Sequence, residues 1–330
     1  MNFKRLFVCL FREILEESRF KTKKMKIRSI FTILLAVVTI FSCKDIKQNS
    51  KEVNAEKTPS LSEEIKINNK GVFINHEMHG DGKFTLLFVH GWCIDQSYWS
   101  NQVAAFNSNY KIVTIDLPGF GKSGTNRKDW SVEAYGADIN AVIEQLNLKN
   151  IIVIGHSMGG NVILEAALEN KEILALIGVD NFKDVGLPLN EATKAEIDGF
   201  MNLLKNNFSE TASAYAESAL FHPSTNQLVK NRVVESFKNN KANIAISSLE
   251  KLFEYALIES NQLSKIQQKL YLINSDATPT NVKGLEETKI AYEVIDIRAT
   301  GHYPMIEKPI VFNNLLQQTI QKIIEKEEKK

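Results

Sequence analysis

The chain has 330 residues, of which 44% are hydrophobic and 24% are charged. This suits one large domain with an insertion, or two modest domains, and excludes a disordered or fibrous protein. The formal net charge of +1 hides a basic N-terminus, since residues 1–42 hold nine Lys and Arg against three Asp and Glu and the rest of the chain carries a net charge of −5. That remainder gives no reason to expect a nucleic-acid partner. The three cysteines have no spacing that predicts a disulfide framework or a metal site.

The N-terminal segment has the layout of a secretory signal. From Met25 a basic start precedes the apolar run 30–41, and small Ser42 stands before Cys43. The run is too short to span a bilayer, which takes roughly 20 helical residues. Ile-Phe-Ser-Cys at 40–43 resembles the lipobox of bacterial lipoprotein signals, and this resemblance implies an exported protein anchored to a membrane through a lipidated Cys43. The alternative is a short amphipathic or membrane-anchoring N-terminus with an unmodified Cys43. The sequence leaves open whether translation starts at Met1 or at Met25.

A polar stretch, residues 44–64, lacks the large apolar side chains needed for packing and is predicted to be a flexible tether. Strand-like runs follow at 64–68, 72–78 and 84–89, separated by turn signals rich in Asn and Gly. His76 and His79 on the second run are interpreted as ordinary strand residues, since no acidic or Cys partner is spaced to complete a metal site with them.

The next strand, 112–115, is followed by the loop Asp116 to Gly124, DLPGFGKSG. Its GFGKS portion could suggest a phosphate-binding loop, but it lacks the four-residue gap between glycines that such a loop needs. Ser131, with Glu133 and Asp138 in the opening turns, then starts a helix that runs to about Leu146.

The most informative stretch is Ile151 to Asn161, IIVIGHSMGGN. Four β-branched residues in a row predict a buried strand, and the apolar spacing of residues 161–168 predicts a helix. Ser157, inside a G-x-S-x-G pattern, therefore lies on a tight strand-to-helix turn that strains its backbone and has no room for side chains at the two glycines. Its hydroxyl is exposed at the end of the strand, where the first NH groups of the helix point at any negative charge that forms.

After the strand 175–179 the alternation of strands and helices stops. Residues 181–265 are predicted to be helical only, for example at 192–204, 211–220 and 242–258. The alternation then resumes with strands at 270–273 and 292–297 and helices at 282–288 and 310–325. This order predicts an α/β fold with a mostly parallel central sheet, helices on both faces and an all-helical insertion.

His302 lies in GHYPMIEKP, residues 301–309, between the last strand and the final helix. This places it at the sheet edge where ligands bind in open α/β sheets, so we interpret it as a catalytic base.

Three motifs resemble those of the α/β-hydrolase family: G-x-S-x-G at 155–159, D-x-P-G-x-G-x-S at 116–123 and G-H-x-P-x-x-E-x-P at 301–309. The resemblance covers about residues 63 to 326 and implies the α/β-hydrolase fold. The expected parts are a signal or processing segment at 1–42, a tether at 43–63, a hydrolase core at 64–180 and 266–330, and a cap at 181–265 that chooses substrates.

The resemblance also implies roles for single residues. The NH groups of Trp92 and Met158 would form the oxyanion hole, and the loop that starts at Asp116 would brace the site. Serine is a poor nucleophile at neutral pH, and histidine, with an ordinary pKa near 6.5, can take its proton and return it to a leaving group. Ser157 and His302 would then catalyse acyl transfer to water, with a carboxylate to hold the imidazole.

At the third member of the triad the sequence departs from the commonest family pattern. The usual family acid follows the strand after the cap, where this chain has Asn274-Ser275-Asp276, so we predict Asp276 in a turn one residue shorter than usual. The competitor is Asp180, which follows the strand before the cap.

The expected function is hydrolysis of a small carboxylic ester by a monomer that needs no cofactor or metal. Hydrolysis of carbon-carbon, amide or thioester bonds and cofactor-free perhydrolysis use the same triad and stay open. A ligand receptor of the same fold with little turnover is the alternative from another class of protein. The partner predicted in each case is a small molecule, an ester or other acyl compound for the enzymes.

Overall fold

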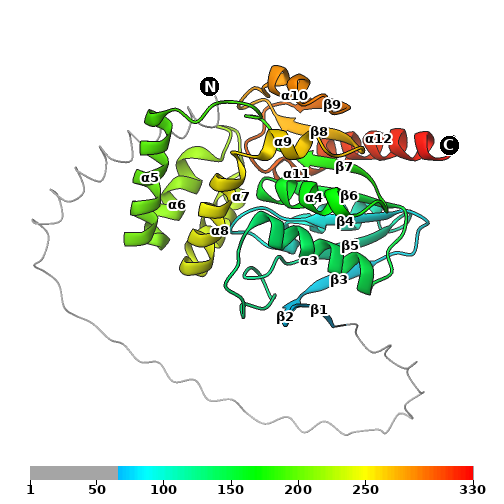
Figure 1. The fold of residues 1–330 in the computed structure, drawn as a ribbon, viewed down its shortest axis with the longest axis horizontal. Coiled ribbons are helices and arrows are strands. Elements are labelled where there is room, and N and C mark those ends of the chain that lie inside the picture. Colours follow the sequence, from blue (N-terminus) through cyan, green and yellow to red (C-terminus); the bar gives the residue numbers. More distant parts are fainter. Residues whose placement is uncertain (1–65, 330) are drawn as a thin grey trace, which may run out of the picture. The chain divides into compact units, whose positions relative to one another are not determined.

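The computed structural model describes residues 66–329 (Figure 1). The predicted signal segment, Cys43 and the predicted tether lie outside these residues. Within residues 66–329, no helix combines the length and the apolar character of a membrane span.

The centre of the fold is a seven-stranded sheet in the order β3-β5-β4-β6-β7-β8-β9. Only β3 runs antiparallel to its neighbour, so the predicted mostly parallel sheet is confirmed. Every residue of β4 and β6 is buried, as expected for central strands covered on both faces. The strands of the sheet are β3 (His76–His79), β4 (Thr85–Val89), β5 (Lys111–Ile115), β6 (Ile151–His156), β7 (Ile173–Val179), β8 (Lys269–Ser275) and β9 (Tyr292–Ile297).

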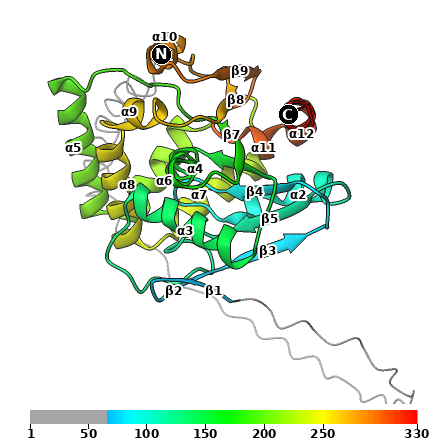
Figure 2. The same ribbon diagram turned by 45° about the vertical axis from the view of Figure 1, so that its right-hand side comes forward.

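A small hairpin precedes the sheet in the chain and contacts α3 (Val132–Gln145) (Figure 2). It consists of β1 (Ile67–Asn69) and β2 (Val72–Ile74). The sequence predicts one strand over 72–78, but the structure divides it at Asn75. The two halves pair with different partners, because β2 bonds to β1 and β3 bonds to β5.

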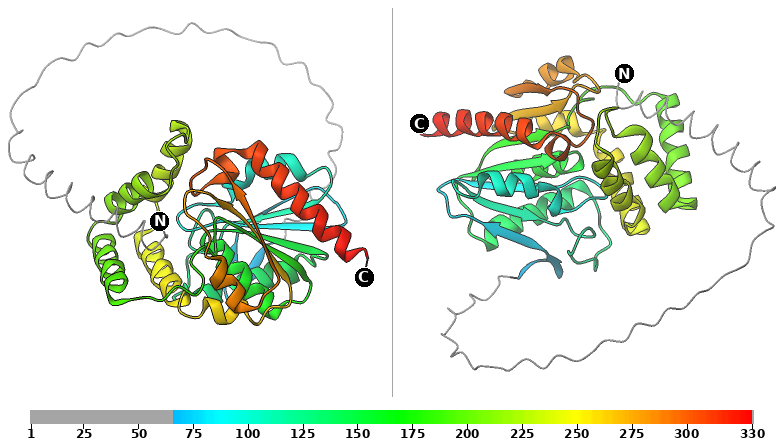
Figure 3. Two further views of the ribbon diagram at one scale, coloured as in Figure 1. Left: turned by 90° about the horizontal axis from the view of Figure 1, so that it is seen from above. Right: turned by 180° about the vertical axis from the view of Figure 1, so that it is seen from behind.

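Helices cover both faces of the sheet (Figure 3). On one face, α2 (Ser100–Phe106) packs with α12 (Pro309–Glu327). On the other face, α3 packs with α4 (Met158–Glu169), and α10 (Val282–Thr288) lies further along. The predicted start of α3 is confirmed, since the Ser131 hydroxyl accepts a hydrogen bond from the N–H of Ala134. The remaining short elements here are η1 (Gln96–Trp99) and α11 (Pro304–Glu307).

Five helices lie between β7 and β8, in the stretch that the sequence predicts to be helical. They are α5 (Glu191–Asn206), α6 (Phe208–Ala219), α7 (Gln227–Lys238), α8 (Ala242–Tyr255) and α9 (Glu259–Leu263). Helices α5 to α8 gather beyond one end of the sheet (Figure 1), whereas α9 packs on α4 and α10. We call residues 181–265 the helical insertion.

Candidate active site

Ser157 occupies the turn between β6 and α4, as the sequence predicts. Its backbone angles, φ 50° and ψ −124°, lie in a region that a residue with a side chain rarely adopts. The strained conformation is held by the N–H of Ser157, which donates to the carbonyl of Val179 at 3.0 Å, and by the N–H of Gly160, which donates to the Ser157 carbonyl at 2.8 Å. Such strain is typical of a nucleophile held on a sharp turn.

The two glycines of the motif leave the space in which this turn closes. A Cβ atom at Gly155 would collide with the backbone of Gly159, and one at Gly159 would lie 2.6 Å from the carbonyl oxygens of Val89 and His90. The turn after β6 is therefore pressed against the end of β4. This confirms that side chains at both positions would collide with it.

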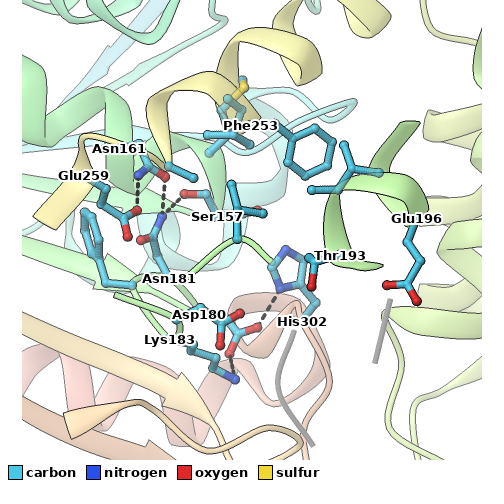
Figure 4. Close-up of a pocket in the computed structure, with 17 residues that line it drawn as sticks. Ser157, Asn161, Asp180, Asn181, Lys183, Thr193, Glu196, Phe253, Glu259 and His302 are labelled. Atoms are coloured by element: carbon cyan, nitrogen blue, oxygen red, sulfur yellow. Dashed lines mark hydrogen bonds and ion pairs between the residues drawn. The ribbon is translucent and has the colours of Figure 1, made fainter. Parts of the chain in front are cut away.

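His302 bonds to Asp180 and not to Asp276. Its Nδ1 donates to Oδ2 of Asp180 at 2.6 Å, and both residues line the same cavity as Ser157 (Figure 4). The bond fixes the imidazole with its proton on Nδ1, so Nε2 is the ring nitrogen that can accept a proton.

The prediction that Asp276 pairs with His302 is therefore wrong. The Asp276 side chain is exposed, and its Oδ1 accepts a hydrogen bond from the N–H of Ala299 at 2.9 Å. That bond joins the turn after β8 to the turn after β9. Asp180, which the sequence names as the competitor, lies one residue after β7 and is 8% exposed.

The carboxylate oxygen of Asp180 that does not bond to His302 also has partners. Its Oδ1 accepts from the backbone N–H of Ser275 at 2.9 Å and lies 2.6 Å from Nζ of Lys183. Burial alone would raise the pKa of Asp180, but the Lys183 ammonium group and the bond from His302 hold this pKa below its ordinary value. Asp180 therefore stays a carboxylate at neutral pH.

The loop that carries His302 is held by hydrogen bonds from both sides. The two carboxylate oxygens of Glu307 accept from the N–H groups of Gly301 and Tyr303 at 2.9 and 3.0 Å. The N–H of His302 donates to the carbonyl of Leu220 in the helical insertion at 2.8 Å, and its own carbonyl lies 2.8 Å from Nε2 of His156. The glutamate of the GHYPMIEKP stretch therefore shapes the histidine loop.

Trp92 and Met158, which the resemblance names as oxyanion donors, line the cavities at Ser157, and their role stays a prediction. Trp92 follows β4, the strand beside β6, and Met158 is the first residue of α4, so its N–H has no acceptor within its own helix. The indole of Trp92 donates to the carbonyl of Ala245 in α8 at 2.8 Å, and this bond fixes the chain at that point.

Asp116 lies outside the group around Ser157 and holds the loop that begins at its own position. Its carboxylate accepts from the N–H groups of Gln96 and Lys122, both at 2.9 Å, and from the side chain of Asn75 at 2.8 Å. This is the bracing role that the sequence suggests.

Two cavities meet at Ser157 and His302, and both are also lined by Leu252 and Phe253 of α8. The larger, with a volume of about 170 Å³, lies over Asp180 and has Asn161 and Thr193 among its polar side chains (Figure 4). The smaller, of about 60 Å³, lies on the Trp92 side and is lined mostly by aromatic and leucine side chains. Ser157 and His302 therefore lie between a mixed cavity and an apolar one.

Sequence reasoning missed three side chains of this site: Asn181, Lys183 and Asn274. Asn181 donates to the Ser157 carbonyl, and the side chain of Asn274 bonds the backbone N–H and carbonyl of Asn181 at 3.1 and 3.0 Å. The signal that could have found them is position, since Asn181 and Lys183 lie in the turn after a buried strand and Asn274 is the last residue but one of the next strand.

Comparisons with known proteins identify the family of the fold. A family model described as the alpha/beta hydrolase fold matches residues 85–309. The Karrikin insensitive 2 receptor CA of Petunia hybrida is 22% identical over 253 residues, which cover 72% of this chain and 92% of the receptor.

Two solved structures share the fold at low sequence identity. An esterase of Exiguobacterium antarcticum (EaEST) has a TM-score of 0.69 at 21% identity and covers 78% of this chain and 98% of its own. The enol-lactonase of Burkholderia xenovorans LB400 has a TM-score of 0.66 at 16% identity and covers 76% and 98%. Because the family match spans more than half of the sequence, this chain belongs to the α/β-hydrolase family.

Proposed function

We propose that the protein is a serine hydrolase that cleaves a small carboxylic ester through an acyl-enzyme. The observation that carries the proposal is the 2.6 Å bond from Nδ1 of His302 to Asp180, beside a serine held on a strained strand-to-helix turn. In this proposal Ser157 is the nucleophile, His302 the base and Asp180 the acid.

The reaction follows from these positions. Nε2 of His302 takes the hydroxyl proton while Oγ of Ser157 attacks the carbonyl carbon, and the N–H groups of Trp92 and Met158 stabilise the oxyanion. The bond to the alcohol oxygen breaks as His302 returns the proton to it. Water then gives a proton to His302 and attacks the acyl-enzyme, and Ser157 leaves with that proton as the carboxylic acid is released.

The size of the two cavities supports a small substrate. Volumes of about 170 and 60 Å³ are below the range of roughly 300 to 1,000 Å³ that drug-sized ligands occupy. A short acyl chain suits the apolar cavity beside Trp92, and the more polar cavity over Asn161 and Thr193 suits the alcohol portion. The esterase and enol-lactonase of similar fold have names that fit ester or lactone chemistry.

Carbon-carbon, amide or thioester hydrolysis and cofactor-free perhydrolysis use the same triad. A receptor with little turnover is the alternative that the Petunia relative favours, since its name is that of a receptor. The test is the time course of p-nitrophenol release from p-nitrophenyl acetate by a known amount of protein. Continuous release over many equivalents supports the hydrolase, whereas one slow equivalent per chain supports the receptor. Esters from acetate to octanoate then define the acyl length.

We also propose that the hydrolase is an exported bacterial lipoprotein. The proposal is supported by the short apolar run and the Ile-Phe-Ser-Cys sequence, in which Cys43 would be the lipidated residue. One myristoyl-size chain holds a protein to a membrane only marginally, so stable anchoring takes the several chains of a lipoprotein. Intact-mass analysis of protein from membranes of a bacterial host tests this. A lipid mass that Cys43→Ser loses supports it, and an unmodified Cys43 in the wild type contradicts it.

A further inference from the structure

Lys183 is a buried lysine beside the carboxylate that bonds to His302. Its side chain is 6% exposed, and its Nζ lies 2.6 Å from Oδ1 of Asp180. The other oxygen of the same carboxylate accepts from His302 at 2.6 Å. The carboxylate therefore lies between an imidazole and an ammonium ion, as the dashed lines of Figure 4 show.

Three further contacts hold the ammonium group in place. Nζ donates to the carbonyl and the hydroxyl of Ser275 at 2.9 and 3.0 Å, and to the hydroxyl of Thr278 at 3.1 Å. These acceptors belong to the end of β8 and the turn after it, a different part of the chain from Asp180. Lysine is seldom buried unless its charge is paired, and here the neighbouring strand supplies a complete set of partners.

We propose that Lys183 is a positioning residue that orients Asp180 toward His302 and offsets its negative charge. The proposal rests on the proposed function, in which Asp180 and His302 serve Ser157. An isolated carboxylate beside an imidazole favours the protonated ring, and a cation behind the carboxylate opposes that effect. The lysine therefore reduces the net negative charge that faces His302.

Other titratable groups surround His302, and the wild type and the Lys183 variants have the same set of them. His156 lies with its ring centroid 4.7 Å from that of His302, and burial lowers the pKa of His156 to about 3, which keeps it neutral. The remaining titratable groups line the two cavities or bond to the histidine loop, and they are Asp184, Glu196, Tyr215, Glu259, Asp276, Tyr303 and Glu307.

The test compares pH profiles of kcat/KM for the full-length chain, its Lys183→Met and Lys183→Arg variants, and the control Lys269→Met. The control breaks an ion pair with Glu293, 3.0 Å long, on the neighbouring strands β8 and β9. The midpoint of the acid limb should rise by about one pH unit or more in Lys183→Met, because one nearby positive charge is lost. Lys183→Arg, which keeps the charge, and the control should retain the wild-type midpoint. An unshifted midpoint in folded Lys183→Met overturns the proposal.

Lys183→Gln is the second variant if Lys183→Met does not fold, because its amide can still donate to Asp180 and Ser275 without a charge. The titration midpoint of the His302 ring, followed by proton NMR and assigned with His302→Asn, gives a measurement that needs no turnover. A higher midpoint in Lys183→Gln than in the wild type supports the proposal, and equal midpoints overturn it. An inactive wild type would contradict the proposed hydrolase but would leave this titration as the test of the lysine.

Discussion

The turns after β7 and β8 offer the site two aspartates in very different surroundings. Asp180 follows β7, is buried, and bonds to His302, Lys183 and the backbone of Ser275. Asp276 follows β8, is exposed, and accepts one hydrogen bond from the backbone of Ala299. Both carboxylates lie at the carboxyl ends of parallel strands, so this position alone does not decide which one assists the histidine.

Sheet order explains much of the difference. Strand β7 is the direct neighbour of β6, and His156 pairs with Val179, so Ser157 and Asp180 each lie one residue beyond paired positions. Strand β8 is one place further from the serine. Asp180 also has a positive φ of 46°, so the chain turns sharply at this residue. The distance from β6 and the local turn at Asp180 together separate the two aspartates.

The largest effect should come from Ser157→Ala. The residual activity of this variant is the baseline with which the variants of both aspartates are compared. Loss of the nucleophile should lower kcat by about 10⁶-fold and abolish labelling by a serine-directed phosphonate. The fold should persist, as checked by circular dichroism, since the hydroxyl contributes little to packing. Labelling that continues in the folded variant would remove Ser157 from the proposal.

Asp180→Asn should lower kcat by about 10⁴-fold with KM little changed, because the imidazolium loses the carboxylate that orients and stabilises it. The substitution also leaves the buried Lys183 charge without its counter-ion, so the melting temperature should be measured on the same sample. Activity within tenfold of the wild type, in a folded sample, would contradict the role of Asp180.

Asn274→Ala should weaken the link between the end of β8 and the turn after β7. The Asn274 side chain bonds the backbone N–H and carbonyl of Asn181 and is fully buried, so its loss leaves buried groups without partners. We expect the free energy of unfolding, measured in urea, to fall by about 1–3 kcal/mol, with a smaller loss of kcat than in Asp180→Asn. Asn126→Ala, which removes an exposed side-chain bond to the Gly71 carbonyl, is the control and should change stability less.

The smallest effect should come from Asp276→Asn. Asparagine retains the Oδ1 acceptor for the N–H of Ala299, and the side chain is exposed, so stability should change by less than about 0.5 kcal/mol. Measured kcat/KM should stay within about threefold of the wild type, a change of similar energy. A larger loss here than in Asp180→Asn would reverse the assignment of the acid.

Much of this comparison could not be read from the sequence. The elbow at Ser157 could be predicted, because a fully apolar strand, two glycines and a helix signal are local features. The choice between Asp180 and Asp276 depends on strand order, which brings β7 and not β8 beside β6. Local spacing carries no information on that order. The sequence therefore favours Asp276, in a turn one residue shorter than the usual family turn.

The contacts of Lys183 were beyond local patterns for the same reason. Lys183 contacts Ser275 and Thr278, which lie more than 90 positions away in the chain, so no spacing rule finds it. The sequence predicts helices throughout residues 181–265 but gives bounds for three of them, and α7, in which Val233 and Phe237 are the buried residues, is not one of the three. The helices with a stronger apolar face, α5 and α8, were predicted close to their observed bounds.

The helical insertion begins inside the turn that carries Asp180, and this limits how the protein could be recombined. Asn181 and Lys183 belong to the insertion, yet they bond to Ser157 and Asp180, and the carbonyls of Lys183 and Val185 accept hydrogen bonds from Asn281 after β8. A chimera that grafts the insertion of another hydrolase at Asp180 would therefore discard side chains that bond to Ser157 and Asp180. The chimera should keep residues 181–185 of the host protein, and the graft can begin after Val185.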